Sequence, residues 1–321
     1  MASQRDVKNR IGSVKNIQKI TRAMEMVAAA RLRRAEQRIA ALRPYADALR
    51  RMTRQAALDA GAEASRMELL GERENVTSVG LLLVTGDRGL AGGFNSQVIR
   101  AGVRAGTELD EEGLRSVWYA TGRRGVSSLT FRGRELSGAY TGFTDKPAYA
   151  DARTVAGELI EAYTSGAVDR VELIYNSYVS PLTQEVTRET LLPLSRATIA
   201  GEETEGGEEG ANAGGAAGAR RSPAPTSPGA RASVPKALVE YEPDAEEILR
   251  RLVPDYVETS IYRALVESAA GFFGAQMTAM RNASENAGEI ITDLTLEMNR
   301  ARQAEITQEI MEVVAGAEGL S

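Results

Sequence analysis

Apolar residues recur at steps of three and four along the first 60 residues. Steps of this size keep side chains on one face of a helix, in the narrow seam of a coiled coil. We predict one helix over residues 4–58, within an N-terminal coiled-coil segment at residues 1–60, with a bend at Pro44. The row contains Val7, Ile11, Val14, Ile17, Ile20, Met24, Val27, Leu32, Ala35, Ile39, Leu42, Leu49, Met52 and Ala56.

The same spacing returns in the C-terminal segment, residues 244–318. We predict a short helix that ends near Pro254 and a long helix from Tyr256. Alanines in its row, with Gly271, Gly274 and Gly288, predict close approach to another helix. Two matching seams at the two ends of the chain predict one antiparallel coiled coil. The row contains Ile261, Leu265, Phe272, Ala275, Ala279, Ala283, Ala287, Ile290, Leu294, Met298, Ala301, Ile310 and Val313.

Residues 75–195 have a different pattern. Residues 79–84 form a continuous apolar run, typical of a buried parallel strand. Further strands are predicted at 117–121 and 170–175, a helix at 148–165, and another strand or a hairpin within 178–192. Strands that alternate with helices indicate an α/β domain. The predicted fold is therefore an α/β central domain plus a long antiparallel α-helical coiled coil formed by the N- and C-terminal helices.

Residues 200–236 are rich in Gly, Ala and Pro and poor in large apolar side chains. Such a segment buries too little apolar surface to offset the entropy lost on ordering. We predict a disordered low-complexity insertion between the central domain and the C-terminal helix.

Composition excludes several kinds of chemistry. The 321 residues include no His and no Cys, which removes thiol nucleophiles, disulfides, His-dependent triads and His- or Cys-ligated zinc. The net charge is −5, yet residues 1–55 hold 14 basic and four acidic side chains, or +10. A basic segment suits nucleic acid, an anionic membrane or an acidic protein surface. With no platform of aromatic residues interleaved, we favour a solvated face or a protein contact over nucleic acid.

The sequence shows no membrane span and no secretory signal. No run reaches 18 apolar residues, and the N-terminus lacks an apolar h-region. Absence of Cys agrees with a reducing compartment.

A glycine-rich loop follows the first predicted strand and precedes a helix predicted from Ser96. This context suits anion binding by backbone N–H groups. The loop lacks the Gly-Lys-Ser/Thr ending of a P-loop and the GxGxxG spacing, so a tight strand-to-helix turn is favoured over a phosphate or partner contact. Its candidate residues are Asp87, Arg88, Gly89, Gly92, Gly93 and Asn95.

Three carboxylates, Glu289, Asp293 and Glu297, share one face of the C-terminal helix. A metal site is one interpretation. A solvated stripe is favoured, because no partner ligands are evident.

Three long motifs resemble the γ subunit family of F-type ATP synthases, in the family's order and over nearly the whole chain except the insertion. Gly271-Phe-Phe-Gly274 departs from a more polar stretch that is common in the family. The motifs are IQKITRAMEMVA at 17–28 with RLRRA at 31–35 and RPYA at 43–46, DRGLAGGFN at 87–95, and MTAM at 277–280 with NAG at 286–288 and NRARQAEITQEI at 299–310.

The resemblance implies a rotor shaft. The terminal helices of this family form a coiled coil inside an α3β3 hexamer, and the central domain sits on the membrane c-ring beside ε. Proton flow through the ring is coupled to ATP synthesis in the β subunits, and ATPase activity is regulated. The partners implied are the α, β and ε subunits and the c-ring, with no nucleic acid and with membrane contact only through partners. Residues implied to contact α and β are Met24, Arg31, Arg33, Arg34, Arg302, Gln303, Thr307 and Glu309.

The same resemblance implies a non-catalytic subunit with no cofactor or metal, peripheral on the cytoplasmic side of the bacterial cell membrane. Lack of a P-loop agrees with the absence of ATP hydrolysis by this chain. Two other hypotheses stay open on the residues alone. One is a small-molecule enzyme built on the α/β domain, with helical arms for dimerisation. The other is a nucleic-acid adaptor that uses the basic N-terminal helix.

Overall fold

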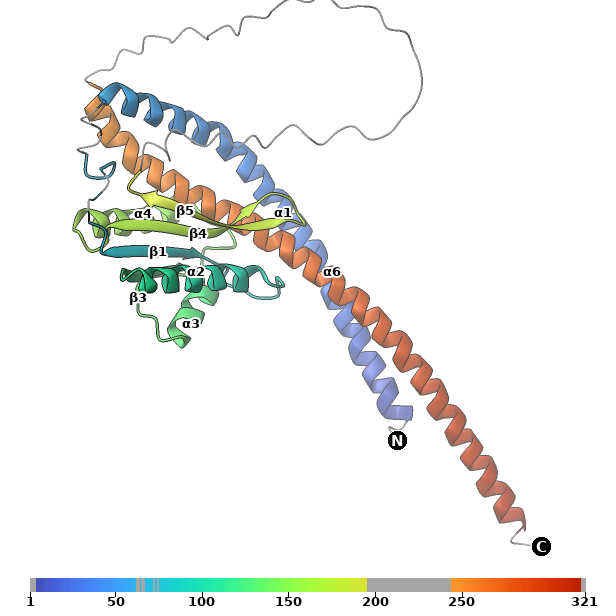
Figure 1. Cartoon of the computed structure of the whole chain (residues 1–321). Coiled ribbons are helices and arrows are strands. Elements are labelled where there is room, and N and C mark those ends of the chain that lie inside the picture. The colour runs from blue at the N-terminus through green and yellow to red at the C-terminus, as the bar shows by residue number, and fades with distance from the viewer. Residues whose placement is uncertain are drawn as a thin grey trace, which may run out of the picture.

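The computed structural model describes residues 4–61, 64, 67–71, 73, 75–194 and 244–318, with the backbone alone for residues 314–318. The protein consists of a sheet-based central domain and a rod of two long helices that runs past it (Figure 1). The predicted insertion at residues 200–236 lies outside the described residues.

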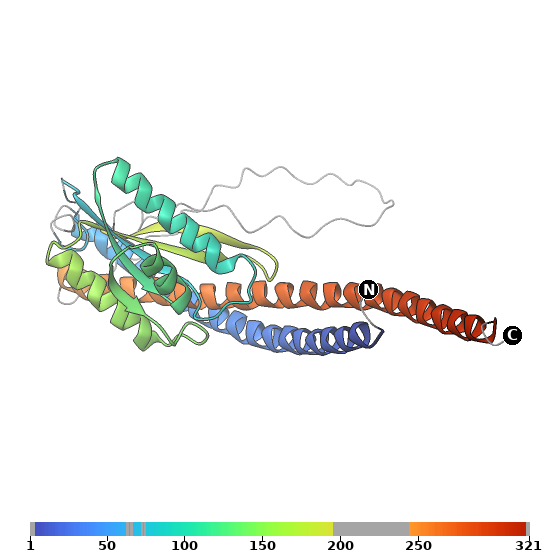
Figure 2. The ribbon, with the colours of Figure 1, turned by 90° about the horizontal axis from the view of Figure 1, so that it is seen from below.

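The rod is made of α1 (Gln4–Ala60) and α6 (Ala245–Glu318), which run antiparallel, so both chain ends lie toward one end of the rod (Figures 1 and 2). At 1.5 Å per residue they are about 85 Å and about 110 Å long. Both helices are continuous through their prolines, so the predicted helix end near Pro254 is wrong. Val253 and Val257 beside it are buried in the core. Their packing offsets the hydrogen bond that proline removes.

The central domain holds a five-stranded sheet in the order β3-β2-β1-β4-β5. Strands β1 (Ser78–Val84), β2 (Arg115–Thr121), β3 (Leu136–Tyr140) and β4 (Arg170–Tyr178) are parallel, and β5 (Gln184–Leu192) returns antiparallel to β4 as a hairpin. Helices α2 (Phe94–Glu111), α3 (Arg123–Phe131) and α4 (Tyr149–Thr164) connect them. The predicted α/β domain with a terminal coiled coil is confirmed.

Alternation along β1 places its side chains on two faces of the sheet. Leu81 and Leu83 pack with α2 and α3, whereas Leu82 and Val84 pack with α4 and with the base of the rod. One face of the sheet is therefore covered by α2 and α3. The other is covered by α4 and by the first turns of α6, so the rod base is part of the domain core.

Three apolar clusters hold the rod along its length. The base packs in the domain core, the middle packs where Leu32 and Ile39 of α1 meet Phe272 and Phe273 of α6, and the outer part packs around Val7, Ile11 and Leu294. We call the middle cluster the exit cluster, because the rod leaves the domain there.

Between the exit cluster and the outer part, the inward row of α1 differs from the predicted seam. Thr21 and Ala28 are buried, whereas Ile20 and Val27, one residue earlier, are 58 % and 52 % exposed. The prediction of Ile17, Ile20 and Val27 as seam residues is wrong. Met52 of α1 and Ile290 of α6 are also exposed.

Polar groups fill the seam in this part of the rod. The Gln18 side-chain amide donates to the Ser284 carbonyl over 3.2 Å, and the Arg281 guanidinium pairs with Glu25 at 2.9 Å. A Cβ on Gly288 would lie 3.2 Å from Gln18 Nε2. Because the helices approach closely here, small and hydrogen-bonded side chains fit the seam better than branched aliphatic ones.

Candidate functional site

The glycine-rich loop after β1 is organised by the side chains of Asp87 and Asn95. Asp87 accepts hydrogen bonds from the Thr144 hydroxyl at 2.8 Å and from the backbone N–H groups of Arg123 and Gly142. Asn95 accepts from the Gly86 N–H at 2.7 Å and donates to the Arg88 carbonyl. These bonds stay within the chain, which supports the interpretation of the loop as a strand-to-helix turn.

The electrostatics of Asp87 agree with that role. Burial alone would raise its pKa, but hydrogen bonds from Thr144, Gly142 and Arg123 outweigh burial and hold the pKa of this carboxyl below its ordinary value. The ionised carboxylate fastens this loop to the start of α3 and to the loop before α4.

The glycines of this loop allow a backbone conformation and a close contact that a side chain would hinder. Gly92 has φ +55°, which favours glycine, and a Cβ on Gly89 would lie 2.8 Å from the Arg124 guanidinium. Gly93 precedes the first turn of α2.

The crevice where parallel sheets of this type bind ligands is filled by the rod. It lies at the carboxyl ends of β1 and β4, where the strand order reverses. A Cβ on Gly86, just after β1, would lie 3.1 Å from the Phe272 ring of α6. Phe94 meets the same ring edge-to-face at 5.8 Å. Aromatic side chains of this chain therefore lie against the carboxyl end of β1.

The predicted partner residues on α1 have different surroundings. Arg33 and Arg34 are exposed, and Met24 is half-buried. Arg31 is 41 % exposed at its side chain, pairs with Asp145 at 3.5 Å and lies over the Phe273 ring at 5.7 Å. Arg31 is thus engaged within the chain, where it links α1 to the central domain and α6.

The predicted partner residues on α6 lie beyond the end of α1. The outer apolar cluster reaches Met298, and every side chain from residue 302 to residue 313 is exposed. We call residues 302–318 the overhang. It carries Arg302, Gln303 and Glu309 on its surface, and the Thr307 hydroxyl donates to the Gln303 carbonyl at 2.8 Å. None of the described side chains of the overhang is covered by this chain.

Sequence reasoning missed an exposed apolar row on α1, because it assigned those residues to the seam. Ile17 is 53 % exposed, and Ile20 and Val27 follow it on the same face at steps of three and seven. We call these three residues the α1 apolar row. The signal that could have found it is the second row one residue later, Gln18, Thr21, Glu25 and Ala28, which has the same spacing and suits a close helix pair.

Charge is divided between the two helices of the outer rod. Residues 4–27 of α1 carry six basic and two acidic side chains, for a net +4, and residues 284–313 of α6 carry seven acidic and two basic ones, for a net −5. The rod therefore has a basic side and an acidic side. In the described part of the chain, no group of three or more acidic side chains is arranged to hold a metal ion.

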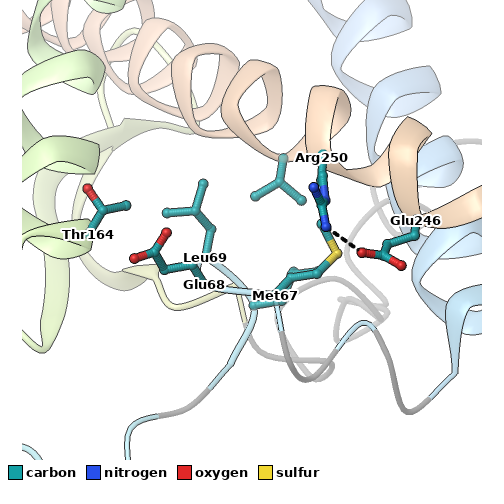
Figure 3. A pocket seen from close by; sticks show the side chains of 8 residues that line it. Met67, Glu68, Leu69, Thr164, Glu246 and Arg250 are labelled. Atoms are coloured by element: carbon teal, nitrogen blue, oxygen red, sulfur yellow. Dashed lines mark hydrogen bonds and ion pairs between the residues drawn. The ribbon is translucent and has the colours of Figure 1, made fainter.

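A cavity of about 570 Å³ lies at the base of the rod (Figure 3). Met67, Leu69 and Val253 supply apolar walls, and Arg250 pairs with Glu246 at 2.6 Å one turn earlier on α6. That pair is an ordinary i, i+4 contact on a helix surface.

Comparison with known proteins places the chain in a family. A family model described as ATP synthase matches residues 3–320. The ATP synthase gamma chain of Rubrobacter xylanophilus is 42 % identical over 321 residues, which cover 100 % of this chain and 99 % of the relative. That of Streptomyces avermitilis is 41 % identical and covers 100 % and 97 %. The chain belongs to the ATP synthase gamma chain family.

Solved structures agree with this membership at the level of the fold. A chain of the Euglena gracilis mitochondrial ATP synthase matches with a TM-score of 0.61 at 13 % identity and covers 99 % of this chain and 94 % of that one. A chain of the Tetrahymena thermophila central stalk and c-ring matches with a TM-score of 0.56 at 21 % identity and covers 83 % and 99 %. Like other gamma chains, the protein is thus a subunit of an ATP synthase. Among its described helices none is long and apolar enough to cross a membrane.

Proposed function

We propose that the chain is the central-stalk rotor shaft of an F1Fo ATP synthase and is itself non-catalytic. The rod stands inside an α3β3 hexamer, and the central domain rests on the c-ring beside the ε subunit. Proton flow turns the ring, and the asymmetric rod changes the nucleotide affinity of the β subunits in turn. The protein then lies on the cytoplasmic side of a bacterial cell membrane, held there by its partners.

The overhang is the single observation that carries this proposal. In the described part of the chain, α6 continues past the start of α1 as far as residue 318, and the exposed Ile306, Ile310, Met311 and Val313 leave apolar surface there that no described residue covers. A surrounding sleeve of protein would cover such a tip on all sides. The α1 apolar row and the basic and acidic sides of the rod lie on the same projecting part.

Within this function, the exposed residues Arg33, Arg34, Arg302, Gln303 and Glu309 and the half-buried Met24 contact the α and β subunits. A guanidinium and a carboxamide form directional bonds that exist at one rotor angle and are lost at another. Thr307 contributes less, because its hydroxyl already bonds within the helix. Arg31 acts mainly inside the chain.

Co-expression with the α and β subunits of the same organism tests the proposal. We expect one copy of this chain per three β subunits and, on immobilised complexes, ATP-driven rotation of a bead attached to the central domain. A chain that stays monomeric in the presence of assembled α and β subunits would refute it.

A further inference from the structure

The exit cluster holds α6 in a slot of the central domain. A Cβ on Gly271 would lie 3.0 Å from the Phe94 ring at the start of α2. A Cβ on Gly274 would lie 2.7 Å from the Pro181 carbonyl at the tip of the β4–β5 hairpin. Gln184 of β5 lies 3.1 Å from the Cβ position of Gly271 and 3.3 Å from that of Gly274, so both glycines turn the same face of α6 toward the hairpin, and a side chain at either position would push the rod away from the domain.

Between the glycines, two aromatic rings fill the slot. Phe272 and Phe273 are 4 % and 3 % exposed and meet edge-to-face at 5.6 Å. Phe272 also meets Phe94 and lies over Gly86, at the reversal point of the sheet. These two edge-to-face contacts resist rotation of α6 about its own axis, because a turn of the helix would break both of them at once.

Arginine contacts extend this arrangement to α1 and to the glycine-rich loop. Arg31 lies over the Phe273 ring and pairs with Asp145, and Arg88 of the loop pairs with the same carboxylate at 3.4 Å. The Tyr178 hydroxyl of β4 donates to Glu36 of α1. Both helices of the rod are therefore attached to the domain at the same level.

We propose that Phe272 and Phe273, with Phe94 and Arg31, form a torsional clamp that fixes the rod to the central domain at one angle. The base of the rod is the first attachment and this clamp is the second. Two attachments separated along α6 define both the direction and the twist of the rod, whereas the base alone leaves the outer rod free to bend and twist about it.

A distance measurement on the full chain tests the clamp without any partner. Because the chain has no cysteine, Phe131→Cys and Ile290→Cys provide two unique sites for nitroxide labels. Phe131 is 93 % exposed on α3, and Ile290 lies on the rod beyond the clamp. In the doubly labelled chain we expect a narrow distance distribution by electron–electron double resonance. Adding Phe272→Ala and Phe273→Ala should widen it roughly twofold.

Tyr45→Ala, which removes an exposed aromatic ring from α1, is the matched control and should leave the distribution narrow. An unchanged width in the Phe272→Ala, Phe273→Ala chain would overturn the clamp. If that chain does not fold, Arg31→Gln replaces it, because this side chain is partly exposed. Arg31→Gln removes the ring contact and the Asp145 pair, so an unchanged width there would equally overturn the proposal.

That the clamp transmits torque rests on the proposed function. It is tested separately, by the number of protons taken up per ATP hydrolysed. In membrane vesicles with the assembled complex, we expect the Phe272→Ala, Phe273→Ala variant to hydrolyse ATP while proton uptake per ATP falls by about threefold or more. Tyr45→Ala should keep the full ratio. An unaltered ratio in the double variant would refute torque transmission through the clamp. Failure of the unsubstituted chain to assemble would instead refute the rotor function and leave the distance result to decide on the clamp.

Discussion

At the scale of single residues, buried carboxylates tie loops to the sheet. Asp169, next to the start of β4, accepts hydrogen bonds from the N–H groups and hydroxyls of Thr77 and Ser78 and pairs with Arg73 at 2.8 Å. Arg73 also donates to the Tyr163 carbonyl and lies over its ring. The Asp169 carboxylate therefore connects the start of β4 to the start of β1 and, through Arg73, to the helix α4.

Asp169→Asn should lower the free energy of unfolding by about 3 kcal/mol at pH 7, because it leaves Arg73 and several donors without their acceptor. Burial raises the pKa of Asp169, but hydrogen bonds from Thr77, Arg73 and Ser78 outweigh it and leave the pKa well below the ordinary value. The carboxylate therefore stabilises the fold above about pH 4, and this contribution is lost as pH falls through its folded pKa. Urea unfolding should show a constant difference between the variant and the original chain from pH 7 to about pH 4, and a difference that begins to shrink between pH 4 and pH 3.

Asp110→Asn is the matched control, since Asp110 pairs with Arg134 at the surface. Its effect should stay below about 1 kcal/mol. An equal loss from both substitutions would contradict the role given to Asp169.

Residue identity alone predicted part of the rod seam, but it failed around residue 20, at Met52, and beyond the start of α1, where the predicted seam residues Ile310 and Val313 are exposed. Val7, Ile11, Leu32 and Ile39 are buried as predicted, because one apolar row is evident there. Around residue 20, two rows of side chains have the same spacing along α1. The sequence pattern favours the more apolar row as the seam, whereas a closely packed helix pair buries the row with the smaller side chains. The engagement of Arg31 with Asp145 depends on residues 114 positions apart, which no local pattern contains.

At the scale of elements, α2 lies unusually close to the sheet because two glycines face it. A Cβ on Gly102 would lie 2.5 Å from Leu83, and a Cβ on Gly106 would lie 2.4 Å from the Trp118 ring. These glycines lower the intrinsic helix propensity of α2, but they allow the helix to pack closely against β1 and β2.

Gly106→Ala should destabilise the protein by about 2 kcal/mol, since the added methyl overlaps the Trp118 ring in a packed core. Gly12→Ala on α1 is the matched control. Nothing lies within 4 Å of its Cβ position, and alanine should stabilise that helix by up to about 1 kcal/mol. Thermal unfolding measures both effects, and shifts of the same sign would contradict the packing described.

The element pattern predicted β1, β2, α4 and β4 within a few residues. It missed α3 and β3, which are nine and five residues long and carry few apolar side chains. Short elements of this kind are held by packing against their neighbours rather than by their own sequence. The continuation of α6 through Pro254 has the same cause.

At the scale of the whole molecule, the rod projects from a domain to which it is fixed at its base and at the exit cluster. The long helices, the antiparallel pairing and the α/β domain followed from the sequence. The relative position of rod and domain did not, because it depends on contacts such as Gly274 with Pro181 that join distant parts of the chain.

Arg302→Ala and Gln303→Ala should leave the melting temperature within about 1 °C of the original, because both side chains are exposed and off the seam. Coupled ATP synthesis in vesicles should fall about tenfold, since directional contacts to the surrounding subunits are lost. Glu285→Ala, an exposed change on the paired part of α6, serves as the comparison. Equal losses of thermal stability and of synthesis would argue against a contact role.

Ile17→Ser with Ile20→Ser removes two members of the α1 apolar row. Because both are exposed in the isolated chain, its stability should change by less than about 1 kcal/mol. Retention on immobilised α and β subunits should fall about tenfold, as the partner loses apolar contact. Unchanged retention would show that this row faces solvent in the complex as well.

The overhang also determines how the shaft bends. Below residue 302 two helices share any sideways load, whereas above it one helix carries that load alone and bends more readily. In the proposed rotor, the single helix of the overhang would therefore be the most flexible part of the shaft, and the two-helix part below it would be the stiffer one. A flexible end could stay seated within a surrounding sleeve of protein while the two-helix part below it moves sideways.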